Sequence, residues 1–117
     1  MIDITFYSGF IGYIYTMNST QPVLTISVAA NLLNTHPRTL MLYERIGIFT
    51  PHRTGTQRRM FSLKDLEELQ FIRFLTQEQG INLKGVKFML EALSLAQKGG
   101  IDLKKLLFPT FKSISLV

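Results

Sequence analysis

Cysteine is absent from the 117 residues of this chain. Disulfide bonds, zinc sites built on thiolates and redox sensing by thiols are therefore excluded together. A chain without cysteine suits the reducing cytoplasm, which is where we expect the protein to act. The two histidines, His36 and His52, lie far apart in the sequence and no third or fourth ligand accompanies them, so we expect neither a metal nor a cofactor.

Groups suited to catalysis are also scarce. Asp65, Glu67 and Glu68 fall on an expected amphipathic helix with basic neighbours, where carboxylates are ordinarily solvated. We therefore predict that the protein is not an enzyme.

The apolar run Ile4–Tyr15 is too short to cross a membrane. It has twelve residues, whereas a spanning helix needs about 20, and it lacks the basic start and cleavage site of a secretory signal. We interpret residues 1–23 as an N-terminal arm, and the part before Met17 is not native if translation begins at that methionine. A native arm is either loose or touches a membrane surface. We assign it no function and expect no membrane partner.

Acidic residues are nearly absent from one quarter of the chain. From His36 to Lys64, a single acid, Glu44, stands against six basic residues, so this stretch carries the whole net charge of +5. Such a concentration of positive charge predicts a surface that binds a polyanion; a solvated basic face is the alternative. The six basic residues are Arg38, Arg45, Arg53, Arg58, Arg59 and Lys64.

Residues 24–98 carry the regular patterns of one globular domain. Ser27 precedes apolar residues at helical spacing and is expected to cap a first short helix. Pro37 suits the first turn of a second helix, because its missing N–H has no partner there, and Gly47 can end that helix in a left-handed conformation. Two short helices joined in this way form a helix-turn-helix. The expected inward residues are Val28, Ala29, Leu32 and Leu33 on the first helix, and Leu40, Tyr43 and Ile46 on the second.

A change of period after Gly47 predicts a β-hairpin. Ile48 and Phe49 precede a tip that contains Gly55, and residues 60–61 follow it. A hairpin directly after a helix-turn-helix is a wing. The expected fold class is therefore mainly α: a winged helix-turn-helix with a two-stranded wing and a following helical pair.

Capping signals define the helical pair. Ser62 and Asp65 have the spacing of a capping box, at the start of a helix that runs toward Gly80. Asn82 can cap the next helix, Leu83–Lys98. The first of these helices has Leu66, Leu69, Ile72 and Leu75 on one side.

Residues 99–117 form an apolar tail. A short helix is expected from Asp102 to Phe108, because Pro109 interrupts the pattern. The apolar residues of the tail either make a dimer or partner contact or fold back on the core of the monomer. These residues are Leu103, Leu106, Leu107, Phe108 and Phe111.

The basic residues fit a DNA-binding mechanism. The second helix can lie in a major groove, where arginine donates two hydrogen bonds to guanine and threonine contacts a thymine methyl. The arginines of the wing have no acid cluster nearby in the sequence, so we expect them to reach flanking phosphates. Tyr43 is either core or a phosphate contact, and Arg45 either contacts DNA or stabilises the helix C-terminus. The candidate DNA-binding residues are Arg38, Thr39, Leu42, Tyr43, Arg45, Arg53, Arg58 and Arg59.

Several segments together resemble the MerR family of bacterial transcription regulators. They are "ISVAANLLNTHPRTLMLYERIGIFTPHR", "RRMFSLKDLEELQFI" and "QEQGINLKGVK", and the similarity extends from Thr25 to about Leu95. The motifs "ISVAA", "HPRTL" and "QEQGINLKGVK" look most like the heat-shock repressor (HspR-like) branch of the family.

The resemblance implies a homodimer that binds double-stranded DNA at a near-palindromic promoter site, in the nucleoid, more as a repressor than as an activator. In the heat-shock branch it also implies a stress response and a DnaK-like chaperone as co-repressor. It places Arg38, Thr39 and Tyr43 on the recognition helix, and Arg53 and Arg59 on the wing.

Two features depart from the family pattern. Met41 and Leu42 stand where the family commonly has Arg-Tyr, so a different operator or affinity is expected. The chain is also too short for a separate effector domain. One alternative function is an excisionase-type architectural protein that bends DNA. The other is a protein-interaction module with a lapsed DNA site.

Overall fold

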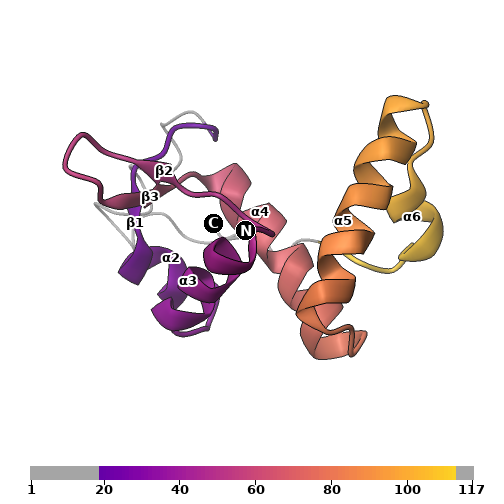
Figure 1. The fold of residues 1–117 in the computed structure, drawn as a ribbon, viewed down its shortest axis with the longest axis horizontal. Helices are drawn as coiled ribbons and strands as arrows, with labels where there is room; N and C mark the ends of the chain where they lie inside the picture. The colour runs from indigo at the N-terminus through magenta and orange to yellow at the C-terminus, as the bar shows by residue number, and fades with distance from the viewer. Residues whose placement is uncertain (1–18, 113–117) are drawn as a thin grey trace, which may run out of the picture.

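Two groups of elements lie on either side of one central helix (Figure 1). The computed structural model describes residues 19–112, so the apolar run of the N-terminal arm and Met17 lie outside the described residues. The central helix is α4 (Leu63–Arg73), which continues into a π-helical turn, η1 (Phe74–Glu78). One side holds α2 (Ile26–Leu32), α3 (Pro37–Ile46) and a small sheet; the other holds α5 (Leu83–Lys98) and α6 (Leu103–Leu107).

Thr25, and not Ser27, caps α2. The Thr25 Oγ1 accepts a hydrogen bond from the Val28 backbone N–H at 3.3 Å. Thr25 also pairs with Met60 in the sheet, which holds its backbone in the extended conformation that an N-cap requires. Our assignment of the cap to Ser27 was wrong because local sequence does not reveal this sheet pairing.

Helix α3 begins and ends as predicted. Pro37 occupies its first turn, and the C-cap Gly47 has φ of +90°. The side chain of His36 caps the helix, since its Nδ1 accepts the Arg38 N–H at 3.0 Å. Leu40 and Tyr43 are buried, which orients the opposite side of α3 toward solvent.

The wing is present, and a third strand extends its sheet. β2 (His52–Arg53) and β1 (Leu24–Thr25) each pair antiparallel with the middle strand, β3 (Arg59–Phe61). Two residues are too few to show the alternation that predicts a strand, so β1 was missed. At the tip Gln57 takes the positive φ, +67°, although Gly55 is the residue better suited to it.

The helical pair follows its predicted caps closely. Ser62 Oγ accepts the Asp65 N–H at 3.0 Å, and Asp65 Oδ2 accepts the Ser62 N–H at 2.9 Å, which completes the capping box. Asn82 caps α5, whose bounds are those predicted. The inward leucines and isoleucine of α4 and η1 are fully buried, so this helix supplies much of the core.

Part of the apolar tail folds back on the monomer, which is one of the two arrangements that its sequence left open. Phe108 and Phe111 pack against Phe71 and Phe74, with ring centroids 4.8 to 5.7 Å apart. By contrast, Leu106 is 71% exposed. The aromatic residues therefore fold back on the monomer. Helix α6, which precedes them, keeps an apolar side in solvent.

Replacement of Ser62 by alanine should destabilise the protein by about 1 kcal/mol, because the first turn of α4 would lose its capping hydroxyl. Urea unfolding followed by circular dichroism measures the change. Ser94→Ala, at an exposed position within α5, is the matched control and should change the unfolding free energy by less than about 0.5 kcal/mol. Equal effects of the two replacements would contradict a capping role for Ser62.

Candidate nucleic-acid interface

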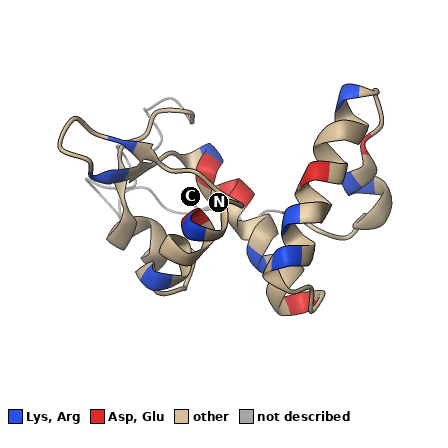
Figure 2. Cartoon of the chain, viewed as in Figure 1, with Lys and Arg blue, Asp and Glu red and all other residues tan. Residues whose placement is uncertain are grey.

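The solvent side of α3 presents two arginines. Arg38 near its start and Arg45 near its end are exposed, and Thr39 and Leu42 are half-buried. Neither arginine side chain has a hydrogen bond or ion pair within residues 19–112. Figure 2 shows this charge at both ends of α3, with further Lys and Arg on the strands of the wing. The side of the helix predicted to read DNA is therefore accessible.

Tyr43 lies in the core, with only 2% of its surface exposed. Burial raises the pKa of its hydroxyl, against smaller opposing effects of a hydrogen bond with Thr76 and the positive charge of Arg73. The phenol therefore stays protonated and links α3 to η1. Of the two roles left open for Tyr43, the structure supports the core role, and we leave it out of the proposed interface.

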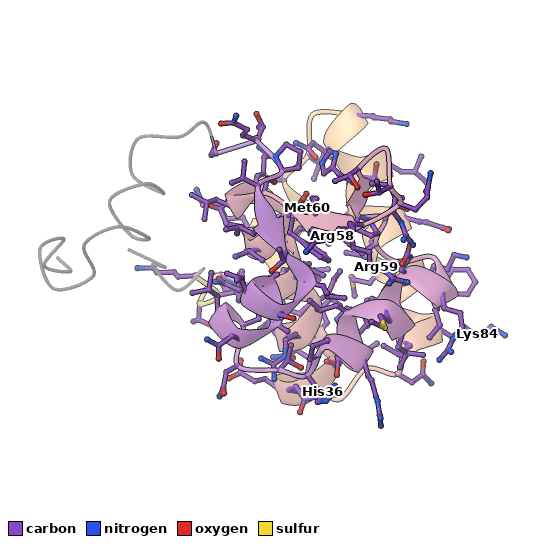
Figure 3. The ribbon with its side chains drawn as sticks, turned by 90° about the vertical axis from the view of Figure 1, so that its left-hand side faces the viewer. His36, Arg58, Arg59, Met60 and Lys84 are labelled. Atoms are coloured by element: carbon purple, nitrogen blue, oxygen red, sulfur yellow. The ribbon has the colours of Figure 1, made fainter. Side chains whose placement is uncertain are left out.

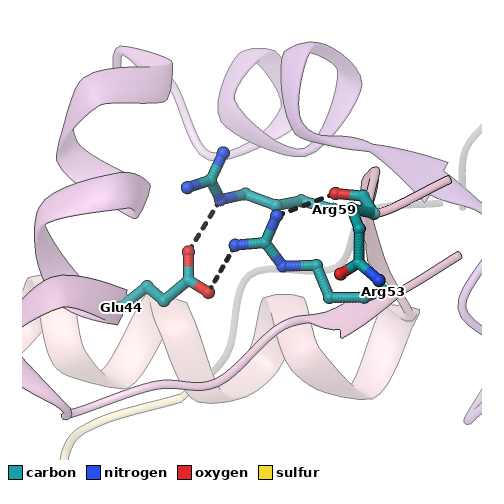
Figure 4. Close-up of polar contacts among 4 residues, drawn as sticks. Glu44, Arg53 and Arg59 are labelled. Carbon is teal, nitrogen blue, oxygen red and sulfur yellow. Dashed lines mark hydrogen bonds and ion pairs between the residues drawn. The ribbon is translucent and has the colours of Figure 1, made fainter.

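Glu44 binds two arginines of the wing, although no acid cluster lies near these arginines in the sequence. Its Oε1 accepts the Arg59 Nε–H at 2.7 Å, and its Oε2 accepts an Arg53 N–H at 2.8 Å (Figure 4). The sequence does not indicate these ion pairs, because Glu44 is 9 residues from Arg53 and 15 from Arg59 along the chain. Only the fold of the wing over α3 brings them together.

The charges around Glu44 keep it ionised. Partial burial, the largest single effect, favours the neutral acid, but the hydrogen bonds and positive charges of Arg59 and Arg53 outweigh it and lower the pKa of Glu44. One carboxylate against two guanidinium groups leaves this cluster with a net positive charge. It therefore still attracts an anion, although less strongly than two unpaired arginines would.

Arg58 is the exposed arginine of the wing tip. Figure 3 looks onto the wing and labels Arg58 beside Arg59. The Arg58 side chain has no ion pair in the described part of the chain. The Arg58 backbone N–H donates to Thr54 Oγ1 at 3.1 Å. The Thr54 N–H in turn donates to the Arg58 carbonyl at 3.0 Å. These two bonds close the tip, so Arg58 projects from an ordered loop.

Sequence reasoning missed two residues that shape this surface. The sequence shows Glu44 as the single acid in a basic stretch. This isolation among basic residues is the signal that could have indicated an arginine partner. The Gln57 carbonyl accepts an Arg53 N–H at 2.8 Å, which no side-chain pattern could have indicated because the acceptor belongs to the backbone. Both residues orient arginines without contributing positive charge themselves.

Residues 19–112 contain neither a candidate metal site nor a candidate membrane-spanning helix. No group of three or more His, Cys, Asp or Glu side chains could hold a metal ion in this part of the chain. None of the helices described there is long and apolar enough to cross a membrane.

Comparison with known proteins agrees with the geometry. The chain matches the family model for MerR helix-turn-helix regulatory proteins over residues 24–93. It therefore belongs to the MerR family of helix-turn-helix regulatory proteins, which confirms the family resemblance and the winged, mainly helical fold. This is a family of regulators and not of enzymes, as expected.

Three individual proteins show which kinds of regulator this chain is similar to. A Streptomyces coelicolor protein named for heat shock, HspR, is 43% identical over 77 residues, which cover 66% of this chain and 51% of the relative. The transcriptional regulator GlnR of Bacillus anthracis is 33% identical over 69 residues, 59% of this chain and 53% of the relative. An uncharacterised helix-turn-helix regulator of Synechocystis is 37% identical over 73 residues, 62% of this chain and 53% of the relative. The chain thus spans about half the length of the curated relatives it matches.

Glu44→Gln should lower the stability of the folded protein at about pH 7, and this difference should shrink as the pH falls below the ordinary range of glutamate. The folded state lowers the pKa of Glu44. The unfolded chain therefore binds that proton more readily, and the stability due to Glu44 is lost as the pH falls through the folded-state pKa. Urea unfolding of both proteins from about pH 7 to about pH 3 measures the difference. A difference independent of pH would contradict the ion pairs.

Proposed function

We propose that this protein is a transcriptional regulator that binds double-stranded promoter DNA as a homodimer and acts as a repressor. The observation that carries the proposal is the position of the basic stretch: its arginines lie on the solvent side of α3 and on the wing of a MerR-type fold. A reading helix and a phosphate-binding wing on one domain are the two parts that sequence-specific DNA binding requires.

In this proposal α3 reads the bases. Arg38 and Arg45 contact DNA from the exposed side of the helix, and Thr39 and Leu42 supply smaller contacts. Met41, 38% exposed, offers an apolar contact where relatives commonly offer a cation. We therefore expect the preferred site to differ from that of relatives with Arg-Tyr at Met41 and Leu42.

The wing binds phosphates. Arg58 is free to do so directly, whereas Arg53 and Arg59 reach phosphates while they remain bound to Glu44. Arg59 uses only its Nε–H for Glu44, and its two terminal amino groups have no hydrogen bond within the described residues. Counterion release would make this contribution strongly dependent on salt.

The proposed dimer contact lies on α5 and α6. Phe88 and Leu95 are 67% and 68% exposed and stand two turns apart on the same side of α5. Ile101, Leu106 and Leu107, which follow α5 in the chain, are further exposed apolar residues. A second copy would bury this surface from water and align two reading helices on the two halves of a near-palindromic site.

The name of the Streptomyces relative, a heat shock protein, supports a stress response, and the resemblance to the heat-shock branch implies a DnaK-like chaperone as a co-repressor. That partner would compete for the same apolar surface of α5 and α6. Action on promoter DNA places the protein in the cytoplasm, at the nucleoid.

Arg38→Ala should relax the preference at one base pair of each half-site by about 1–3 kcal/mol, the value of a bidentate arginine–guanine contact. Fluorescence anisotropy on duplexes selected by the wild-type chain, and on single-base variants of them, measures it. Arg58→Ala is the matched control: it should weaken binding to all duplexes alike and reduce the salt slope by about one unit. Unchanged specificity in Arg38→Ala would exclude base reading by this residue. If the wild-type chain binds no duplex even at low salt, the protein-interaction module is the remaining candidate function.

Leu95→Lys should convert the dimer to a monomer, because an unpaired ammonium would be buried at the contact. Sedimentation velocity measures the mass of the particle. Gln97→Lys introduces the same side chain at an exposed position of α5 on a different side of the helix and should leave the dimer intact. A wild-type chain that sediments as a monomer would exclude the proposed contact.

A further inference from the structure

We infer that Glu44 is a positioning residue for DNA binding: its carboxylate holds the recognition helix α3 and the wing in one fixed relation, so that base reading and phosphate binding occur together. The inference rests on the proposed function, because it assigns a task to a residue between the two proposed DNA-binding parts.

Glu44 contacts both strands of the wing at once. Oε2 accepts from Arg53 on β2 and Oε1 accepts from Arg59 on β3, at 2.8 and 2.7 Å. These two arginines are paired across the hairpin. The carboxylate therefore fixes the orientation of the hairpin as well as its distance from α3.

A second hydrogen bond carries this connection toward the tip. Arg53 donates one terminal N–H to Glu44 and another to the Gln57 carbonyl at 2.8 Å. The positive φ of Gln57, +67°, is an unusual conformation for a residue other than glycine. A continuous chain of polar contacts thus runs from α3 through Arg53 to the loop that carries Arg58.

Charge alone would argue against an acid at this position. A carboxylate beside the phosphate-binding arginines repels DNA and reduces the electrostatic attraction of the surface. Any benefit of Glu44 to binding must therefore come from geometry. The sheet needs such support, since strands of two and three residues are short even by the standard of small sheets.

Glu44→Asp separates geometry from charge. Aspartate keeps the negative charge but is one methylene shorter, so it cannot reach both strands without a shift of the wing. Glu44→Ala removes both the charge and the contacts. The matched control is Glu91→Gln, which removes an exposed carboxylate from α5, on the opposite side of the molecule from the wing (Figure 1).

The measurement is the ratio of affinities for two duplexes of equal length and base composition, one selected in vitro by the wild-type chain and one scrambled. In Glu44→Asp the ratio should fall about tenfold, within the range for loss of one bidentate base contact, while affinity for the scrambled duplex stays unchanged. In Glu44→Ala the ratio should also fall, while affinity for the scrambled duplex rises because a negative charge has gone. Glu91→Gln should keep the wild-type ratio.

If Glu44→Asp keeps the affinity ratio of the wild-type chain, the inference is wrong. Equal gains on both duplexes in Glu44→Ala would also overturn it, because Glu44 would then be only a competitor of phosphate. Circular dichroism verifies that each variant folds. If Glu44→Asp does not fold, Glu44→Gln tests the inference in its place. An amide accepts only at its one oxygen, so Glu44→Gln should also lower the affinity ratio. A wild-type chain that selects no sequence refutes the proposed function, whereas unchanged variants of a selective wild type refute the inference alone.

Discussion

The burial of one side of α4 and η1 is the constraint on which the other elements depend. Leu66, Leu69, Ile72 and Leu75 are fully buried, and the elements on both sides of this helix pack against the same core. Because one helix contributes to the packing of both groups, the exposed side of α3 and the apolar side of α5 keep a fixed relation.

Polar contacts supplement this core at two points. Arg73 donates to the Leu33 carbonyl and so satisfies a backbone acceptor at the end of α2. Glu44 connects α3 to a wing whose strands are too short to orient themselves. Both contacts join segments distant in sequence: Arg73 donates one hydrogen bond to a carbonyl, whereas Glu44 uses both carboxylate oxygens, one for each arginine.

The apolar tail shows how one segment can serve two purposes. Phe108 and Phe111 complete an aromatic cluster with Phe71 and Phe74, which ties α6 to the central helix. Leu106 on the same short helix stays in solvent. The aromatic contacts thus hold an exposed apolar side in place, which is the condition for a preformed contact surface and reduces the entropic cost of association.

Local chemistry in the sequence determined where α3 and α5 begin and end and which of their sides is buried. The helix-end residues act through their own backbone or through a neighbour three residues away, as in Pro37, Gly47 and Asn82. Their roles can therefore be predicted from the sequence without knowledge of the fold. Tertiary structure alone decided the pairing of Glu44 with Arg53 and Arg59 and the cap at Thr25. Each of these depends on an approach between distant segments, and sequence spacing carries no information about the direction in which a side chain meets a remote partner.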